Sequence, residues 1–351
     1  MAPLRPITSV HFLRVLGDSA YSIEDAGVPV AEQPAHHRKC RVAGGMTASA
    51  AFFDRWLLPL VIAGAVLGLG WSSPPRTAVA HHGVSAALIV LVAAVGLGLP
   101  ATALSQARAQ GRRVLLAVLG GAILLPLVAW LASRLVPAGP LRLGVLAAGV
   151  APSEVAAVAL AALAGGQAAV SAAVLVGATL MSVLTAGPVL HLLAGPASNF
   201  SSADLLLSLI RIVAVPLLLA ALLRACTPAR LAPLADTTSA VVSSAAVLVL
   251  IWLVAGQAHL GTSYIRAGVA LLLYLVGAAA LGAVTSLGLP RPVAVSILLP
   301  VAMRDFAIAA GIATAAFGPE AAAALGLYGV LVLTLGAATA RIVPKLPETV
   351  Q

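Results

Sequence analysis

Long apolar stretches follow one another along the chain from about residue 53 onward. Each is close to the ~20 residues that a helix needs to cross ~30 Å of hydrocarbon, at about 1.5 Å per residue. We therefore predict ten transmembrane helices joined by short connectors rich in Gly, Pro and Ser. The predicted spans are residues 53–72, 79–102, 113–136, 142–164, 168–193, 203–225, 237–257, 264–287, 291–316 and 320–342.

The composition agrees with a chain that lies mostly in lipid. Hydrophobic residues make up 61% of the 351, charged residues 9%, and the mean hydropathy is +1.08. The net charge of +9 comes from arginines spread singly between apolar runs, with few aromatics among them. This pattern is typical of cytoplasmic loop charge, so we predict the lipid bilayer as a partner and no nucleic acid.

The two ends of the chain differ from the apolar middle. Residues 1–45 are polar, mixed in charge and without an apolar h-region, so they are not a signal peptide. We interpret them as a disordered cytoplasmic tail, or as the product of a start codon placed too early, since Met46 sits just before the first span. We place the first five-helix repeat at 46–197, the second at 198–345 and a C-terminal tail at 346–351.

The orientation follows from Lys and Arg near the ends of the spans. With the N-terminus inside, nine such residues fall on the cytoplasmic side and four on the outer side. By the positive-inside rule we predict a multi-pass protein of the cell inner membrane with both termini in the cytoplasm. The cytoplasmic set is Arg55, Arg108, Arg112, Arg113, Arg224, Arg230, Arg291, Arg341 and Lys345, and the outer set is Arg76, Arg134, Arg142 and Arg266.

An internal repeat relates the fourth and ninth spans. Each carries a mid-span proline followed by charge, Pro152 with Glu154 in one and Pro300 with Arg304 and Asp305 in the other. The prolines are 148 residues apart, close to half of the membrane region. Because five helices per half is an odd number, we predict an all-α fold of two inverted repeats with broken fourth and ninth helices.

The charges beside these prolines are the candidate chemistry. Glu154 and Asp305 are the two acidic residues well inside the spans, and each buried charge costs roughly 2.5–3.5 kcal/mol on insertion scales. If the breaks cross, Glu154, Arg304 and Asp305 converge near mid-membrane. We expect Glu154 or Asp305 to bind the coupling ion, and Arg304 or free helix-end amides to bind a substrate anion. The alternatives are an internal Glu154–Arg304 salt bridge and an ordinary proline kink.

No motif for ATP binding, dinucleotide binding, zinc hydrolysis or serine hydrolysis stands in a suitable context. We therefore predict that the chain is not an enzyme and uses no cofactor. The coupling ion is H⁺ or Na⁺, and the partner is a small organic anion or amphiphile.

Three stretches resemble the bile acid:sodium symporter family, in the larger group of arsenite permeases and auxin-carrier-like proteins. The most specific runs from Pro152 through Leu163-Ala-Gly-Gly-Gln167-Ala-Ala-Val-Ser171, which is similar to the family's proline-led fourth helix and its LA-x-G-D-x-A-L-S type segment. The others are Ser105 to Trp130 and Pro300 to Glu320. The resemblance implies ten helices in inverted repeats, a panel and a core domain, and a site where helices four and nine cross.

The departures from this family concern its sodium ligands. An ungapped match puts Ala157 and Val158 where the family has a Ser-Asn pair, and puts Pro300, Arg304 and Asp305 on its E-x-G-x-Q-N pattern. Side-chain oxygen remains at Ser171 and Asp305, so sodium is expected only near these two residues. An arsenite carrier is disfavoured because the fourth span has no thiol.

Two functions stay open at this point. The first is a secondary transporter of a small organic anion by alternating access, coupled to protons or to sodium at an altered site. The alternative is a non-transporting membrane protein, an intramembrane enzyme or a partner subunit, that kept the fold. The candidate site residues are Pro152, Ser153, Glu154, Ser171, Pro300, Arg304 and Asp305.

Overall fold

The computed structural model describes residues 59–99, 110–195, 200–259 and 261–342. Across these ranges every regular element is a helix, and the extended backbone is limited to one isolated bridge between Ser153 and Arg304. The predicted tails at 1–45 and 346–351, and the start of the first span, lie outside the described residues. Within the described ranges, the prediction of an all-α protein is confirmed.

A helix or a pair of helices stands in each of the ten predicted ranges. Helices α7 and α8 divide the fourth predicted span, and α14 and α15 divide the ninth. The helices are Pro59–Gly70, α3 (Ser73–Ala80), α4 (Gly83–Gly98), α6 (Gly111–Ser133), α7 (Pro140–Val150), α8 (Ala156–Leu163), α9 (Ala168–Ala194), α10 (Ser202–Leu209), α11 (Val215–Cys226), α12 (Ala232–Ala255), α13 (Thr262–Thr285), α14 (Arg291–Ala302), α15 (Phe306–Phe317), α16 (Pro319–Ala322) and α17 (Leu325–Ile342). Short π and 3₁₀ segments, Ile210–Ala214 and Ala229–Leu231, precede α11 and α12.

Six helical stretches of the described chain are long and apolar enough to cross a membrane, and α3 with α4 makes a seventh candidate bent by 80°. The six are Gly111–Ser133, Ala168–Ala194, Ser202–Cys226, Ala232–Ala255, Thr262–Thr285 and Pro319–Thr339. The remaining predicted spans are short or broken helices, so the arrangement of ten crossings in two inverted repeats stays a prediction. The chain is a multi-pass membrane protein.

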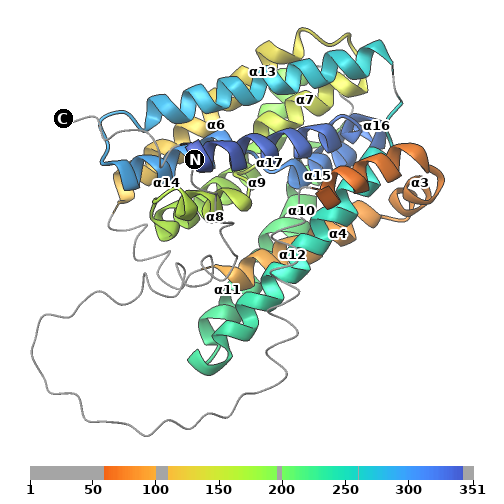
Figure 1. Cartoon of the computed structure of the whole chain (residues 1–351). Coiled ribbons are helices and arrows are strands. Elements are labelled where there is room, and N and C mark those ends of the chain that lie inside the picture. The colour runs from red at the N-terminus through yellow and green to blue at the C-terminus, as the bar shows by residue number, and fades with distance from the viewer. Residues whose placement is uncertain (1–58, 100–109, 196–199, 260, 343–351) are drawn as a thin grey trace, which may run out of the picture.

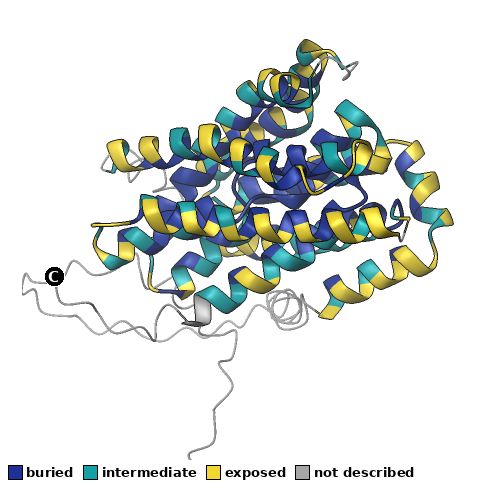
Figure 2. Ribbon diagram, turned by 90° about the horizontal axis from the view of Figure 1, so that it is seen from above, coloured by how far each residue is buried: buried dark blue, intermediate teal, exposed yellow. Residues whose placement is uncertain are grey.

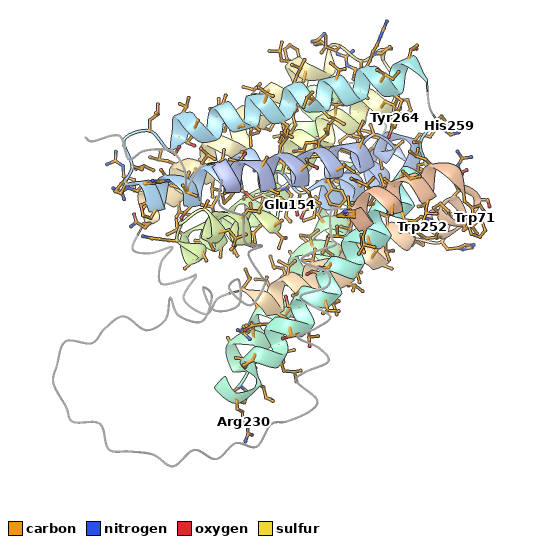
Figure 3. The ribbon with its side chains drawn as sticks, in the orientation of Figure 1. Trp71, Glu154, Arg230, Trp252, His259 and Tyr264 are labelled. Carbon is orange, nitrogen blue, oxygen red and sulfur yellow. The ribbon has the colours of Figure 1, made fainter. Side chains whose placement is uncertain are left out.

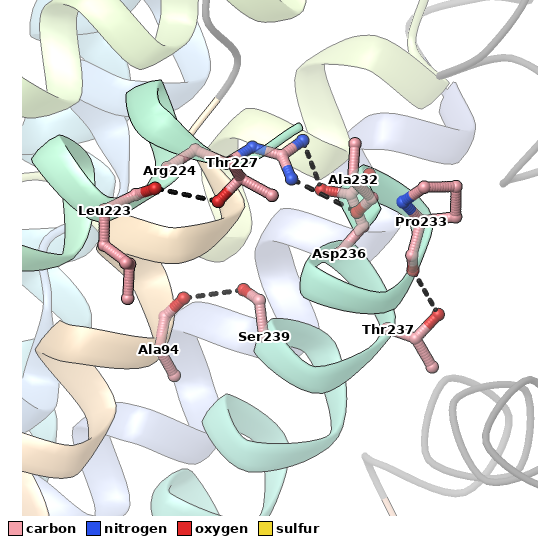
Figure 4. A network of polar contacts seen from close by, with 9 residues as sticks. All are labelled: Ala94, Leu223, Arg224, Thr227, Ala232, Pro233, Asp236, Thr237 and Ser239. Atoms are coloured by element: carbon pink, nitrogen blue, oxygen red, sulfur yellow. Dashed lines mark hydrogen bonds and ion pairs between the residues drawn. The ribbon is translucent and has the colours of Figure 1, made fainter. Parts of the chain in front are cut away.

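One group of helices, which we call the flanking unit, consists of the Pro59–Gly70 helix, α3, α4, the Ser202–Cys226 stretch that contains α10 and α11, and α12 (Figure 1). Helix α4 packs mainly against α11 and α12. Figure 4 shows the polar contacts at one end of this unit, where Arg224 forms an ion pair of 2.7 Å with Asp236 and donates to the Ala232 carbonyl. Ser239 donates to the Ala94 carbonyl over 2.7 Å and so ties α12 to α4.

The second group, which we call the crossing unit, consists of α6 to α9 and α13 to α17. Helix α13 packs against α6 and α14, and α6 packs against α7 and α9. Glycines allow these close approaches: a Cβ added at Gly282 would lie 2.7 Å from the Leu298 carbonyl oxygen. In Figure 1, α11 and the adjoining end of α12 run obliquely away from α8 and α14, while α15 contacts α4, α10 and α12 where the units meet.

Buried residues gather in the centre of the molecule, and exposed residues lie on the outer helices (Figure 2). Many of the exposed residues are large and apolar, as on α6 (Leu115, Leu116, Ile123, Leu127) and on α11 (Leu218, Leu219, Leu222, Leu223). An outer surface of leucine and isoleucine is the surface that hydrocarbon tails cover.

Candidate functional site

The first helix break lies between α7, which ends at Val150, and α8, which begins at Ala156. Pro152 causes it, because proline lacks an N–H and favours an extended conformation in the preceding residue, as Ala151 shows with ψ of 153°. The carbonyl of Ala148, four residues before Pro152, therefore has no helical donor. The hydroxyl of Tyr274 from α13 donates to it over 3.1 Å.

The second break is also preceded by a proline, but here the helix continues beyond the proline before it ends. Pro300 lies inside α14, which continues to Ala302, so the break in the ninth span comes at Met303–Asp305, after the proline. Helix α14 tolerates Pro300 because the carbonyl of Ser296, four residues earlier, accepts a hydrogen bond of 3.0 Å from the hydroxyl of Ser171 on α9. In both breaks a hydroxyl from another helix satisfies the carbonyl that the proline leaves free.

The two breaks cross each other in antiparallel extended conformation. The N–H of Glu154 donates to the Met303 carbonyl, and the N–H of Asp305 donates to the Pro152 carbonyl, each over 2.8 Å. These bonds frame the bridge between Ser153 and Arg304. The crossing thus satisfies backbone groups that would otherwise be unpaired within the membrane, as irregular backbone at that depth requires. Glu154, Arg304 and Asp305 are brought together.

All three charged side chains of the crossing are buried: Glu154 is 5% exposed, Arg304 4% and Asp305 2%. Figure 3 places Glu154 in the middle of the assembly, away from the ends marked by Arg230 and His259. Among the described residues no ion pair within 4.0 Å joins Arg304 to a carboxylate, so the alternative of a closed Glu154–Arg304 salt bridge is not realised. Buried ionisable groups without direct pairing are costly to keep in a membrane, which makes the crossing the candidate functional site.

The carboxylates lie at the N-termini of the two half-helices beyond the breaks. Oδ1 of Asp305 accepts from the backbone N–H groups of Ala307 and Ile308 over 2.9 Å each, as an N-cap of α15. The carboxylate of Glu154 lies close to Asp305 and to the N–H groups of Ala156 and Phe306, the first residues of α8 and α15. The helix-end amides of α15 are therefore occupied by the chain's own Asp305.

Several buried polar atoms at the crossing have no hydrogen-bond partner among the described residues. They are Ser153 Oγ, Glu154 Oε2, Arg304 Nε and Tyr328 Oη. Tyr274 and Tyr328 lie within electrostatic range of the Arg304 side chain, and their ring centroids are 6.0 Å apart. A cluster of unsatisfied buried groups calls for an explanation such as a bound ligand, an ion or water.

A small cavity reaches the crossing from the flanking unit. Its space of about 20 Å³ is enough for about one water molecule. Ser153 and Asp305 contribute to its wall, together with Thr179 of α9. The other lining residues are apolar: Leu91, Val92 and Val95 of α4, Val155, Leu175, Leu217 of α11, and Ile308. The cavity therefore lies between the two units and touches both breaks.

Ser171 and Asp305, the residues near which we expect sodium, are both engaged in other contacts. The Ser171 hydroxyl donates to Ser296, and Ser171 does not line the cavity that Asp305 lines. In the described part of the chain no three His, Cys, Asp or Glu side chains are grouped to hold a metal ion. Ser171 supports α14 at Pro300.

Tyr274 and Tyr328 are absent from the predicted site. Both side chains are fully buried. The Tyr274 hydroxyl donates to the Ala148 carbonyl of α7, and Tyr328 lies within electrostatic range of Arg304. Their positions in the sequence could have identified them as candidates, because a tyrosine in the middle of an apolar span needs a partner for its hydroxyl. The chain has only four tyrosines, which makes two such positions informative.

Comparison with known proteins gives one family. A search of curated proteins finds no match to the chain. The family model of the Sodium Bile acid symporter family matches residues 85–267, just over half of the 351 residues. This range includes the first break, most of α4 and the whole of α9 and α11, the helices that contribute Leu91, Leu175 and Leu217 to the cavity wall. The chain therefore belongs to the sodium bile acid symporter family.

Proposed function

We propose that the chain is a secondary active transporter of a small organic anion, working by alternating access and coupled to protons. Membership of a symporter family and the many apolar helices support transport across a membrane. The observation that carries the finer proposal is the crossing of two helix breaks, where Glu154, Arg304 and Asp305 are buried without a direct ion pair among the described residues.

Glu154 is the residue that we assign to the proton. Asp305 is engaged as the cap of α15, whereas Oε2 of Glu154 has no partner in the described structure. A carboxyl group that binds and releases a proton changes the charge of a buried site by one unit. Such a change alters the energy of the closed site strongly, because charge is expensive in a poorly hydrated interior.

Alternating access would use the two helix groups as its moving parts. The cavity lies at their contact, with the crossing on one side and α4 and α11 on the other. Movement of the crossing unit against the flanking unit would expose the same residues first to one side of the membrane and then to the other. We place the site in the cell inner membrane with both termini in the cytoplasm, as the distribution of Lys and Arg predicts.

Uptake into proteoliposomes tests the proposal. Purified chain would be reconstituted, and a panel of labelled organic anions tested under an imposed pH gradient or an imposed sodium gradient. We expect uptake that follows the pH gradient, needs no sodium and is lost in Glu154→Gln. Asp236→Asn is the matched control, since Asp236 is a carboxylate of the flanking unit.

The other outcomes each decide against part of the proposal. Sodium-driven uptake that is insensitive to pH would show that the coupling ion is sodium and not the proton. No uptake of any anion under either gradient, from protein that is folded in the vesicles, would favour a non-transporting membrane protein.

A further inference from the structure

The cavity between the two units has room for one water molecule. Its space is about 20 Å³, and a water needs roughly 10–15 Å³ and two to four polar partners. Three of the lining residues carry side-chain oxygen, namely Ser153, Thr179 and Asp305, and the others are apolar. These three side chains come from the first break, from α9 and from the second break. The cavity therefore has the size of a water site and the polar groups to hold one.

Ser153 supplies a donor to the cavity. Its side chain is 1% exposed, and its Oγ has no hydrogen-bond partner in the described part of the chain. The backbone around it is fixed, because Ser153 is bridged to Arg304 where the two breaks cross. A buried hydroxyl without an acceptor is unfavourable, so the cavity that this side chain lines should hold one.

Asp305 and Thr179 supply acceptors. Both backbone N–H groups that cap α15 donate to Oδ1 of Asp305, which leaves Oδ2 for a further donor. The Thr179 hydroxyl donates to the Leu175 carbonyl over 2.8 Å, so its proton is used and its oxygen can still accept. One donor and two acceptors are the partners of a water that accepts one hydrogen bond and donates two.

Glu154, to which we assign the coupling proton, reaches the cavity only through its neighbour. It is 5% exposed and does not line the cavity. Asp305 does line the cavity, and its carboxylate lies close to that of Glu154. Chains of polar groups carry protons through membrane proteins, because apolar side chains cannot. Asp305 thus lies between the cavity and Glu154.

We infer that one water, held by Ser153, Thr179 and Asp305, carries the coupling proton from solvent to Glu154. The inference rests on the proposed function and adds the route of its proton. In the first step the water receives a proton from solvent and gives one to Oδ2 of Asp305. In the second step Asp305 gives a proton to Oε2 of Glu154 and is ionised again. The net result is one proton moved from solvent to Glu154, with the water unchanged.

The walls of the cavity connect this proton route to the movement of the two units. Leu91, Val92 and Val95 of α4 and Leu217 of α11 form its flanking side. While the units are in contact, these apolar side chains separate the water from solvent. Movement of the flanking unit away from the crossing unit would open this wall, so the proton is admitted when the site opens. Ser153 is a positioning residue, since it orients the water and carries no charge.

The role of Ser153 in holding the water is tested by the stability of the purified full chain in detergent. Ser153→Ala removes a hydrogen bond if the hydroxyl donates to a water, and should then lower the unfolding midpoint by about 1–2 °C. If the hydroxyl has no partner, the same variant removes an unsatisfied buried donor and raises the midpoint. The sign of the shift therefore decides between the two cases.

Proton delivery is measured at Glu154 itself by infrared spectroscopy, without a transported substrate. The protonated carboxyl band of Glu154, assigned by its loss in Glu154→Gln, shifts when H₂O is replaced by D₂O, and the rate of this shift reports proton exchange. Ser153→Ala should slow the exchange at least about tenfold, because the route loses the group that orients its water. Val92→Ile, which adds one methyl group to the cavity wall, should slow it as well.

Two control variants separate proton delivery from packing. Ser182→Ala removes a buried hydroxyl of α9 that donates to the Val150 carbonyl over 2.6 Å, beside the same break but outside the cavity. It should lower the unfolding midpoint and leave the exchange rate within about twofold of wild type. Val90→Ile adds its methyl group on α4 at a position that is 47% exposed, and should change neither quantity.

Each contrary result has a separate meaning. A higher midpoint for Ser153→Ala, or wild-type exchange in either Ser153→Ala or Val92→Ile, overturns the water route and leaves the proposed function standing. A sodium-dependent rise of the midpoint that disappears in Ser153→Ala would place a cation in the cavity and also overturn the route. Absence of a protonated Glu154 band at every pH at which the chain stays folded would reject the proton assignment of the proposed function, and the route with it.

Discussion

The flanking unit and the crossing unit place their charges in opposite ways. In the flanking unit, Arg224 and Asp236 form a direct ion pair, and Asp236 is 46% exposed near the end of a helix. In the crossing unit, Arg304 and its neighbouring carboxylates are almost fully buried, and no ion pair joins them in the described structure. A closed pair at an exposed end is the arrangement of a structural contact. Ionisable groups left without a partner at a buried crossing are the arrangement on which the proposed proton coupling rests.

The largest predicted effect distinguishes a loss of proton coupling from a loss of substrate movement across the membrane. Glu154→Gln should reduce net proton-driven uptake by about 100-fold, because the neutral amide cannot carry a proton through the site. Exchange of labelled for unlabelled substrate across the vesicle membrane should persist, since it needs no net proton movement. Equal loss of exchange and net uptake would instead indicate that Glu154 is needed for binding or folding.

A glycine contact of the crossing unit should give the next largest effect, on stability. Any Cβ at Gly144 of α7 would overlap the carbonyl oxygen of Ala321 on α16, whereas a Cβ at Gly120 of α6 would meet nothing. Gly144→Ala should therefore lower the free energy of unfolding by about 1–3 kcal/mol, as overpacking does. Gly120→Ala is the control and should be neutral or slightly stabilising. Similar unfolding midpoints for the two variants in detergent would contradict the close packing of α7 against α16.

A substitution at Ser171 tests whether its hydroxyl oxygen stabilises α14 or binds a sodium ion. Ser171→Ala leaves the buried Ser296 carbonyl without a partner and should cost about 1–2 kcal/mol of stability. Sodium titrations of the unfolding midpoint should give the same response in wild type and variant. A sodium-dependent stabilisation that disappears in Ser171→Ala would place a sodium ion beside this residue.

The smallest effect is expected in the flanking unit. Replacing its ion pair by Arg224→Gln with Asp236→Asn should change the free energy of unfolding by less than about 1 kcal/mol, because partly exposed pairs contribute little. Net uptake should stay at the wild-type rate. A loss of transport in this double variant would show that the flanking unit takes a direct part in coupling, and would remove the contrast between the two units.

The convergence of charged residues at the candidate site could be predicted from local chemistry in the sequence. Proline within an apolar span removes a backbone donor, so Pro152 and Pro300 pointed to disturbed helices at corresponding places of the fourth and ninth spans. The charges beside them identified Glu154, Arg304 and Asp305, which do lie together. Such a prediction succeeds because it depends on the backbone of one segment and on the cost of charge in lipid.

The contacts between helices distant in sequence could not be predicted. The position of the second break depends on Ser171 of α9, which satisfies the carbonyl freed by Pro300 and lets α14 continue to Ala302. Tyr274 does the corresponding work for α7 at a distance of 126 residues from its acceptor. No periodicity within one span encodes which hydroxyl reaches which carbonyl, and Tyr328 escaped notice for the same reason.

Coupling between solute and proton at the crossing is the central claim, and it is tested most directly in the reverse direction. Proteoliposomes holding purified chain and a pH-sensitive dye would be given an inward gradient of a transported anion, with sodium absent and the membrane potential clamped. The account predicts that the interior acidifies with wild-type protein and not with Glu154→Gln. Anion entry without any pH change in the wild-type vesicles, or with a strict need for sodium, would contradict it.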